Sequence, residues 1–397
     1  MKNVVIVDGL RTPFGRLGGG LRQFHNVEMG AAVIRAVMEK NQLDPKEVDA
    51  VYYGTANGDA LCNNPARYAA LMAGLPYESS AVAAEMQCGS AIAALNHAAY
   101  RIMMGDADTI LVGGGETFSQ RYAKFSTSAE PYKMLAPVAI TPQLAPAKED
   151  QLIMIQVADR MAEKWGITRE ECDAFALRSQ LRAKNAMENG FLDGQIAPVV
   201  IPATKKTPEI VVDKDEHPRP QTTAEGLAKL RAIYEGGVTT AGNASGRNDG
   251  ASMLLMMSEE KALAMGYKPL ARWVGGIDVG CDPKLMGIGP AYSNLKLLKK
   301  FGMKIADIDV FECNEAFAAQ NLGVIREMEL QTGETIDQEK WNPNGGAIAF
   351  GHPNGASGGR VAQYALRQLQ LTGGQFAMVS SCCGGGLGVS ALFERYV

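Results

Sequence analysis

The chain has 397 residues in two similar halves, and this internal repeat limits what it can fold into more than any other feature. A short run of apolar and aromatic residues predicts a strand in each half, over 49–54 and over 309–313. Roughly forty residues further on, each half has a predicted helix with a reactive residue at its start, Cys88 or His352. A glycine-rich strand end, over 109–115 and over 377–382, then closes each half. This pattern predicts an α/β fold in which the reactive ends of the two halves converge.

Cys88 stands just before a helix-forming run over 91–104 that ends at Gly105. A helix N-terminus stabilises negative charge through its dipole and its free N–H groups. This position therefore predicts a thiol whose pKa lies below its usual value. The ordinary alternative is a small buried cysteine packed under a helix.

His352 lies in a glycine-rich turn, 351–358, and a helix is predicted over 356–369. A helix N-terminus disfavours the imidazolium ion, so we expect the ring to stay neutral and to act as a base. The alternative is a plain turn histidine. Of the four histidines in the chain, however, His352 alone has a glycine-rich sequence on both sides.

The third reactive residue is Cys382, which precedes a run of glycines at 384–386. Glycine lets a substrate approach the main chain and leaves backbone N–H groups free to bind an anion. Two cysteines and one histidine beside such backbone predict chemistry at a carbonyl group.

Six sequence blocks resemble, in the same order, those of the thiolases, a family of acyl-CoA C-acyltransferases. They span nearly the whole chain: 11–15, 88–90, 242–246, 314–317, 351–358 and 382–388. The resemblance implies the thiolase fold, with two βαβαβαββ repeats in five layers (αβαβα) and an inserted loop domain. It also implies the reversible, CoA-dependent cleavage of a 3-oxoacyl-CoA to acetyl-CoA and a shortened acyl-CoA, or the reverse Claisen condensation.

The resemblance further implies three domains. Residues 1–120 with 243–269 are expected to form the N-terminal half, 121–242 a lid-like loop domain that holds coenzyme A, and 270–397 the C-terminal half. Within the loop domain, the sequence predicts a proline-rich loop to about Lys148 and then three helices. These helices are expected over 149–165, over 169–189 behind a capping box that begins at Thr168, and from a cap at Thr222 to about Tyr234.

By resemblance, Cys88 is the nucleophile of a ping-pong mechanism, and it forms an acyl-enzyme after His352 takes its proton. Cys382 is implied as the general acid/base at the α-carbon of acetyl-CoA. Two oxyanion holes are implied as well. One consists of His352 and a water held by Asn314, and the other of the backbone N–H groups of Cys88 and Gly384.

For coenzyme A, the resemblance places Ser245 near the pantetheine arm and Arg219 near the adenine nucleotide, and it aligns Met154 with a pocket methionine. The chain departs from the family at Gln87 and Arg247, which are polar where the family is commonly apolar. These departures raise the alternative of an acyl tail with a polar or carboxylate group, as in a 3-oxoadipyl-CoA thiolase. The competing interpretation is that Arg247 meets coenzyme A or solvent.

Composition bears on the binding partners and the cellular compartment of the protein. A net charge of -4 predicts no general attraction to nucleic acid, and no apolar run approaches the roughly 18 residues that a membrane span needs. Seven cysteines without framework spacing predict reduced thiols in an intracellular, cytoplasmic protein. No metal or redox cofactor is expected, since coenzyme A and acyl-CoA are substrates, and the family resemblance implies a homodimer or homotetramer.

A function of a different class is a catalytically silent acyl-CoA or lipid-binding protein on the same fold. Such a protein is expected to lack the nucleophile or the base. Cys88, His352 and Cys382 are all present, which disfavours this alternative.

Overall fold

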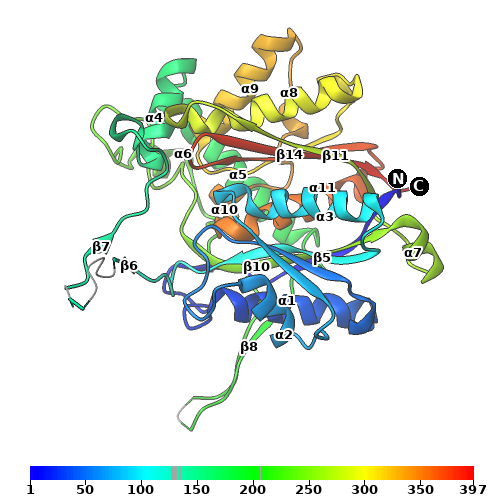
Figure 1. Ribbon diagram of the computed structural model, residues 1–397. Coiled ribbons are helices and arrows are strands. Elements are labelled where there is room, and N and C mark those ends of the chain that lie inside the picture. The colour runs from blue at the N-terminus through cyan, green and yellow to red at the C-terminus, as the bar shows by residue number, and fades with distance from the viewer. Residues whose placement is uncertain (127–131, 134–135, 206) are drawn as a thin grey trace.

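The computed structural model describes residues 1–126, 132–133, 136–205 and 207–397. Its elements form five layers, in which two sheets alternate with three layers of helices (Figure 1). This arrangement confirms the predicted α/β class and layer order. The proline-rich loop predicted before Lys148 includes residues 127–131 and 134–135, which lie outside the described residues.

Five strands form the sheet of the first half: β1 (Val4–Arg11), β3 (Ala50–Gly54), β4 (Ser80–Ala84), β5 (Thr109–Glu116) and β10 (Asn248–Ser258). They lie in the order β4, β3, β5, β10, β1. β3 is parallel to both of its neighbours, whereas β10 is antiparallel to β5 and β1. Helices α1 (Asn26–Lys40) and α2 (Pro65–Met72) cover the outer face of this sheet (Figure 1).

The second half repeats this order with β11 (Ala271–Gly280), β14 (Leu387–Arg395), β13 (Phe376–Cys383) and β12 (Val310–Cys313). β12 and β13 are parallel, and the other pairs are antiparallel. A single parallel bridge from Phe311 to Trp341 takes the place of β4. Helices α8 (Gly289–Phe301) and α9 (Ala318–Thr332) form the outer layer here. The internal repeat predicted from the sequence is confirmed.

The two sheets meet edge to edge. β1 pairs with β11 through only two residue pairs, Val5 with Arg272 and Ile6 with Ala271. The short strand β2 (Gly15–Arg16) pairs with the start of β10 at Asn248 and Asp249, and the whole makes one ten-stranded sheet.

The middle layer holds α3 (Ser90–Met104), α11 (Asn354–Thr372) and the short α10 (Ala347–Phe350). Glycines let these helices approach each other and the sheets. A Cβ on Gly358 would lie 2.8 Å from Ile92 N, and a Cβ on Gly54 would lie 2.5 Å from Ala91 N. The start of α11 therefore packs directly against the start of α3, which brings the two predicted reactive helix starts together.

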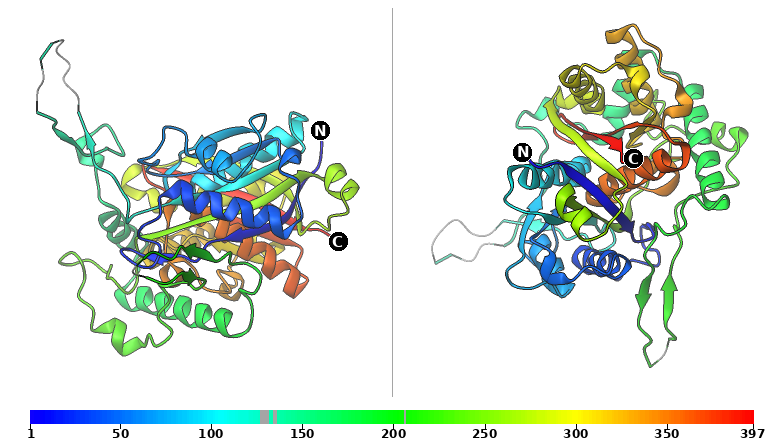
Figure 2. Two further views of the ribbon diagram at one scale, coloured as in Figure 1. Left: turned by 90° about the horizontal axis from the view of Figure 1, so that it is seen from below. Right: turned by 90° about the vertical axis from the view of Figure 1, so that its right-hand side faces the viewer.

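The segment between the halves adds helices and hairpins. Its elements are β6 (Lys124–Phe125), β7 (Ala139–Ile140), α4 (Met154–Trp165), α5 (Arg169–Glu188), β8 (Val199–Ile201), β9 (Ile210–Val212) and α6 (Ala224–Ala228). A further short helix, α7 (Glu259–Ala264), follows β10. Figure 2 shows the β8–β9 hairpin extending well beyond the body of the molecule.

Two of the three helices predicted in this segment need correction. α4 begins at Met154 rather than Glu149, because residues 148–150 form a separate 3-10 turn and Ile153 is extended. α6 is capped by Thr223, whose side chain accepts from Gly226 N, and not by Thr222. It also ends at Ala228, since Ile233 N donates to Thr239 O rather than to a helical carbonyl. The capping box at Thr168 is confirmed.

All seven cysteines are free thiols. Within the part of the chain that the structure describes, no helix is both long and apolar enough to cross a membrane.

Candidate active site

Cys88 lies in the 3-10 turn Gln87–Gly89, which leads directly into α3. Its side chain is half-buried. The turn also contacts the second half of the molecule, because Ser381 Oγ donates to Cys88 O at 3.3 Å. The site is therefore formed from both repeats.

The low pKa predicted for Cys88 is wrong. Burial raises the pKa of the Cys88 thiol to about 12, and the negative charge of Glu116 adds to the increase. The backbone N–H groups of Cys88 and Gly384 lower this pKa, but their effect is smaller than that of burial. The turn thus supplies hydrogen-bond donors to the thiol without holding it as a thiolate.

His352 lies between α10 and α11, and its ring is buried between two polar side chains. Ser357 Oγ lies 2.6 Å from Nδ1 and also donates to Pro353 O at 3.1 Å. Because the hydroxyl donates its only proton to Pro353 O, it must accept from His352 Nδ1–H. The lone pair of His352 is then on Nε2, which lies 3.3 Å from Asn314 Nδ2.

The imidazole ring is also held in its neutral form. Burial lowers the pKa of His352 to about 3, and the positive charge of Arg360 acts in the same direction. Neutrality was predicted from the helix N-terminus, and here burial is its main cause. A neutral ring with its lone pair on Nε2 can accept a proton there, in place of the hydrogen bond that Asn314 Nδ2 donates to it.

Cys382 lies near the end of β13 and is fully buried. Burial raises the pKa of its thiol well above the usual value, and the nearby Cys88 adds to this increase. Gly384 follows in the turn between β13 and β14, where its backbone N–H reaches the Cys88 thiol. Cys88, Cys382 and Gly384 therefore meet at one place.

Two of the residues predicted to contact coenzyme A line a common cleft. Arg219 and Ser245 border it together with Leu227, Leu230 and Ile348. The Arg219 side chain is exposed, while its backbone N donates to Gln180 Oε1 at 2.9 Å. The other two predicted contacts do not line this cleft. Met154 begins α4 and packs against the core, whereas Arg247 has an exposed side chain and a backbone bridge to His352.

Comparison with known proteins identifies the family. The model of the thiolase N-terminal domain matches residues 4–260, and that of the thiolase C-terminal domain matches residues 267–395. The chain belongs to the thiolase family.

Relatives of this thiolase include beta-ketoadipyl-CoA thiolases and acetyl-CoA acetyltransferases. A beta-ketoadipyl-CoA thiolase of Acinetobacter baylyi is 41% identical over 406 residues, with 100% of both chains covered. An acetyl-CoA acetyltransferase of Chromobacterium violaceum is 42% identical over 397 residues, with 99% of both chains covered. The crystal structure of the Bacillus anthracis acetyl-CoA acetyltransferase superimposes with a TM-score of 0.92 at 38% identity and covers 100% of this chain and 99% of that one. The chain is thus an acyltransferase of the thiolase class.

Three residues of the thiolase site were missed by sequence reasoning. Ser357 sets the tautomer of His352, and Asn248 Oδ1 accepts from His352 N at 3.0 Å. Glu116 Oε2 accepts from Ala56 N at 2.9 Å and from Gly355 N at 3.2 Å, and burial raises its pKa to about 7. Ser357 lies within the glycine-rich block around His352, and Glu116 directly follows the glycines of β5, so both had a signal in the sequence.

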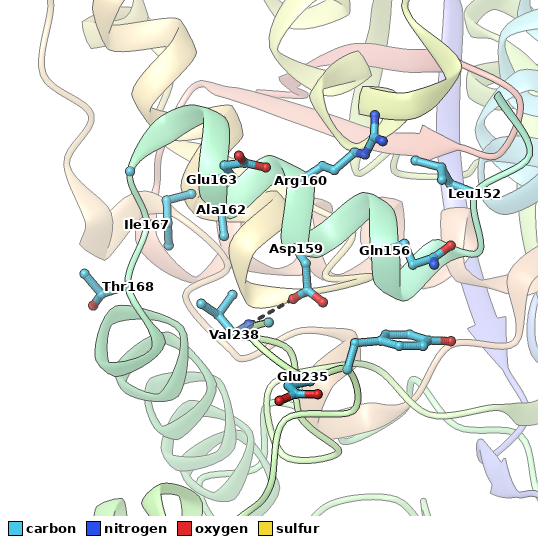
Figure 3. A pocket seen from close by; sticks show the side chains of 14 residues that line it. Leu152, Gln156, Asp159, Arg160, Ala162, Glu163, Ile167, Thr168, Glu235 and Val238 are labelled. Atoms are coloured by element: carbon cyan, nitrogen blue, oxygen red, sulfur yellow. Dashed lines mark hydrogen bonds between the residues drawn. The ribbon is translucent and has the colours of Figure 1, made fainter. Parts of the chain in front are cut away.

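A larger cavity of this thiolase lies beside α4, and no proposed catalytic residue lines it (Figure 3). It is bordered by one side of α4 and by the turn at residues 234–238. Asp159 joins the two, since its carboxylate accepts from Val238 N at 3.0 Å and Thr239 N at 2.9 Å. We assign this aspartate to holding the turn in place.

Proposed function

We propose that Cys88, His352 and Cys382 carry out the thiolase reaction in two steps. In the first, Cys88 Sγ attacks the 3-oxo carbonyl carbon of the 3-oxoacyl-CoA while His352 Nε2 takes the thiol proton. The carbon–carbon bond breaks, and Cys382 returns a proton to the α-carbon of the departing acetyl-CoA. In the second step, coenzyme A attacks the acyl-enzyme and releases the shortened acyl-CoA. Condensation is the reverse sequence.

The observation that best supports this proposal is the environment of His352. A thiol with a pKa of about 12 needs a base beside it, and a ring with its lone pair on Nε2 and a pKa of about 3 stays unprotonated at neutral pH. Asn314 supports the same centre, because its Oδ1 is buried without a partner in the described protein and is suited to hold a water. The N–H groups of Cys88 and Gly384 are suited to the second oxyanion.

The test is CoA-dependent cleavage of acetoacetyl-CoA, a medium-chain 3-oxoacyl-CoA and 3-oxoadipyl-CoA by the wild type and by Cys88→Ala. We expect the variant to lose about 10⁴-fold or more in kcat, and mass spectrometry of the quenched wild type to find the acyl group on Cys88. Cleavage that persists in the variant would reject Cys88 as the nucleophile. Absence of cleavage by the wild type would instead favour a silent acyl-CoA-binding protein.

A second candidate concerns the acyl tail, for which we propose a polar or carboxylate group. The side chain of Arg247 supports it, since it is exposed, no described acidic side chain pairs with it, and its backbone pairs with that of His352. Several relatives that are 41% identical are named beta-ketoadipyl-CoA thiolases. Arg247→Leu is expected to lower kcat/KM for 3-oxoadipyl-CoA about tenfold relative to acetoacetyl-CoA. An unchanged ratio would assign Arg247 to coenzyme A or solvent.

We further propose that residues 121–242 cover coenzyme A between the two halves, with Arg219 and Ser245 as contacts and Met154 at the acyl pocket. The shared cleft of the first two supports the CoA contacts. The enzyme is proposed to act in the cytoplasm as a homodimer or homotetramer without a metal or redox cofactor. Light scattering of the purified protein measures the assembly, and Arg219→Ala is expected to raise the KM for coenzyme A several-fold with kcat retained.

A further inference from the structure

The backbone of Gln87, the residue directly before Cys88, has an unusual conformation. Its φ is 47°, in the left-handed region that residues with a Cβ rarely adopt. Three other described non-glycine residues have a positive φ, namely Gln42, Tyr132 and Asn342, and none of them precedes a reactive residue. A conformation of this kind persists only where surrounding groups enforce it.

Two side chains hold the Gln87 turn from its two sides. Glu85 Oε1 accepts from Gln87 N at 2.8 Å and from Gln87 Nε2 at 2.7 Å. Ser90 Oγ accepts from Met86 N at 2.9 Å and donates to Gln87 O at 2.7 Å. The peptide groups before and after Gln87 are therefore both fixed by hydrogen bonds from within the same short segment.

The turn determines where Cys88 points. It places the Cys88 thiol within reach of the backbone N–H groups of Cys88 and Gly384. It also lays the Gln87 side chain against the glycine turn, since a Cβ on Gly384 would lie 3.4 Å from Gln87 Cγ. If Gln87 relaxed to an ordinary negative φ, the peptide that leads into Cys88 would rotate, and the thiol would move relative to Gly384.

We propose that Glu85 is a positioning residue for the nucleophile, which it directs toward Gly384 by holding Gln87 in the left-handed conformation. This inference rests on the proposed role of Cys88. Glu85 also has a separate electrostatic effect: like Glu116, its negative charge disfavours the Cys88 thiolate. The hydrogen bonds of Glu85 thus favour reaction by placing the thiol, whereas its charge disfavours reaction by destabilising the thiolate. Variants can separate these two effects.

The decisive experiment is a double-mutant cycle of Glu85→Ala with Gln87→Gly, read out as the rate at which acetyl-CoA acetylates Cys88 in a single turnover. Glycine adopts a positive φ without strain, so it removes the need for Glu85. We expect Glu85→Ala to slow acetylation about tenfold or more when residue 87 is Gln and less than about twofold when it is Gly. An equal loss in both backgrounds would overturn the proposal.

A further variant, Glu85→Gln, separates the hydrogen-bond acceptor from the charge. It keeps an acceptor for Gln87 N but removes the charge, so acetylation is expected to stay within about threefold of wild type. The pH above which iodoacetamide alkylates Cys88 is then expected to fall. Glu116, Cys382 and Cys383 remain as the titratable groups that face the thiol. If Glu85→Gln slowed acetylation and left the pH dependence of alkylation unchanged, positioning by the hydrogen-bond acceptor would be contradicted.

The control is Glu78→Ala, which removes an exposed glutamate just before β4, the strand that Glu85 follows. It is expected to leave acetylation unchanged. Thermal unfolding of each variant checks that the fold is retained. If the wild type is not acetylated at Cys88, the proposed function fails; if it is acetylated but the cycle shows no coupling, only the role of Glu85 fails.

Discussion

His352 is held at both ends of its ring, and the two ends have different tasks. Ser357 accepts from Nδ1–H and so leaves the lone pair on Nε2, beside Asn314. Where a histidine binds a metal, loss of the partner that fixes its tautomer typically costs about 10- to 100-fold in function, and we take the same range here. Ser357 therefore supports the reaction by orienting His352, although it does not itself react with the substrate.

Our first prediction concerns a variant that lacks the Ser357 hydroxyl. Ser357→Ala is expected to lower kcat about 10- to 100-fold, because the ring loses the acceptor that selects its tautomer. The KM for coenzyme A is expected to stay within about twofold, since Ser357 does not line the CoA cleft. Steady-state kinetics of the variant check both values, and a raised KM with an unchanged kcat would assign Ser357 to binding instead.

The neutral state of His352 also predicts a pH effect on stability. Its pKa is about 3 in the folded protein and about 6.5 in an unfolded chain, so the unfolded state binds more protons between these values. The free energy of unfolding must therefore fall as pH falls below about 6.5. At pH 4.5, two pKa units below the unfolded value, the loss from this residue is about 2.7 kcal/mol.

Urea unfolding at pH 7.5 and 4.5 measures this loss. The decrease between the two is expected to be about 2–3 kcal/mol smaller in His352→Asn than in the wild type. Glu116 and Glu312, whose pKa values are raised to about 7 and about 8, act in the opposite direction but are present in both proteins. A decrease of the same size in both would show that His352 is not held neutral.

At the scale of single residues, the sequence predicts which side chains are reactive but not how the site controls them. Cys88, His352 and Cys382 stand out through their glycine neighbours, which are local features. The pKa of Cys88 depends on burial by both halves of the molecule, and local sequence contains no measure of that burial. Likewise, the bond from Gly355 N to Glu116 joins residues 239 positions apart.

At the scale of elements, the close approach of α3 and α11 gives a second kind of prediction. A Cβ on Gly358 would lie 2.8 Å from Ile92 N, a backbone atom that cannot rotate away. Gly358→Ala is therefore expected to reduce the free energy of unfolding by about 1–3 kcal/mol. Chemical denaturation checks this value, and the matched control is Gly280→Ala, whose exposed Cβ would meet nothing within 4 Å and is expected to change stability by less than about 0.5 kcal/mol. Equal stability of the two variants would contradict tight packing of the middle layer.

The elements themselves were predictable where local and tertiary forces agree. β3, β5, β12 and β13 were correct to within about one residue, because each is an apolar run bounded by polar residues or glycines. The cap of α6 was misplaced because Thr222 Oγ1 instead donates to Arg219 O at 2.8 Å. Adjacent threonines offer equivalent caps, and only the local backbone path decides between them.

At the scale of the whole molecule, one buried ion pair fastens the base of the β8–β9 hairpin to the first half. Arg11, at the end of β1, binds both carboxylate oxygens of Asp215 at 2.6 and 2.7 Å, and both side chains are almost fully buried. Arg11→Met leaves the buried carboxylate without its charged partner and with only the hydrogen bond from Phe14 N, and it is expected to cost about 3–5 kcal/mol. Denaturant unfolding measures the change.

The control for this pair is the partly exposed bridge between Lys2 and Asp108, also 2.6 Å long. Lys2→Met is expected to cost less than about 1 kcal/mol, because water already solvates both charges. A loss from Arg11→Met no greater than that from Lys2→Met would show that the buried pair does not fasten the hairpin.

The position of β10 has a consequence for how the protein is made. β10 lies between β1 and β5, yet 131 residues lie between the end of β5 at Glu116 and the start of β10 at Asn248. At about 5–20 residues per second, a ribosome takes about 7–26 s to synthesise that interval. Throughout this interval, the position of β10 in the sheet is unfilled, and the facing edges of the apolar strands β1 and β5 lack their partner. Cotranslational folding of this enzyme must therefore wait for a strand from beyond the middle of the chain, and the nascent polypeptide is a natural client for chaperones during the delay.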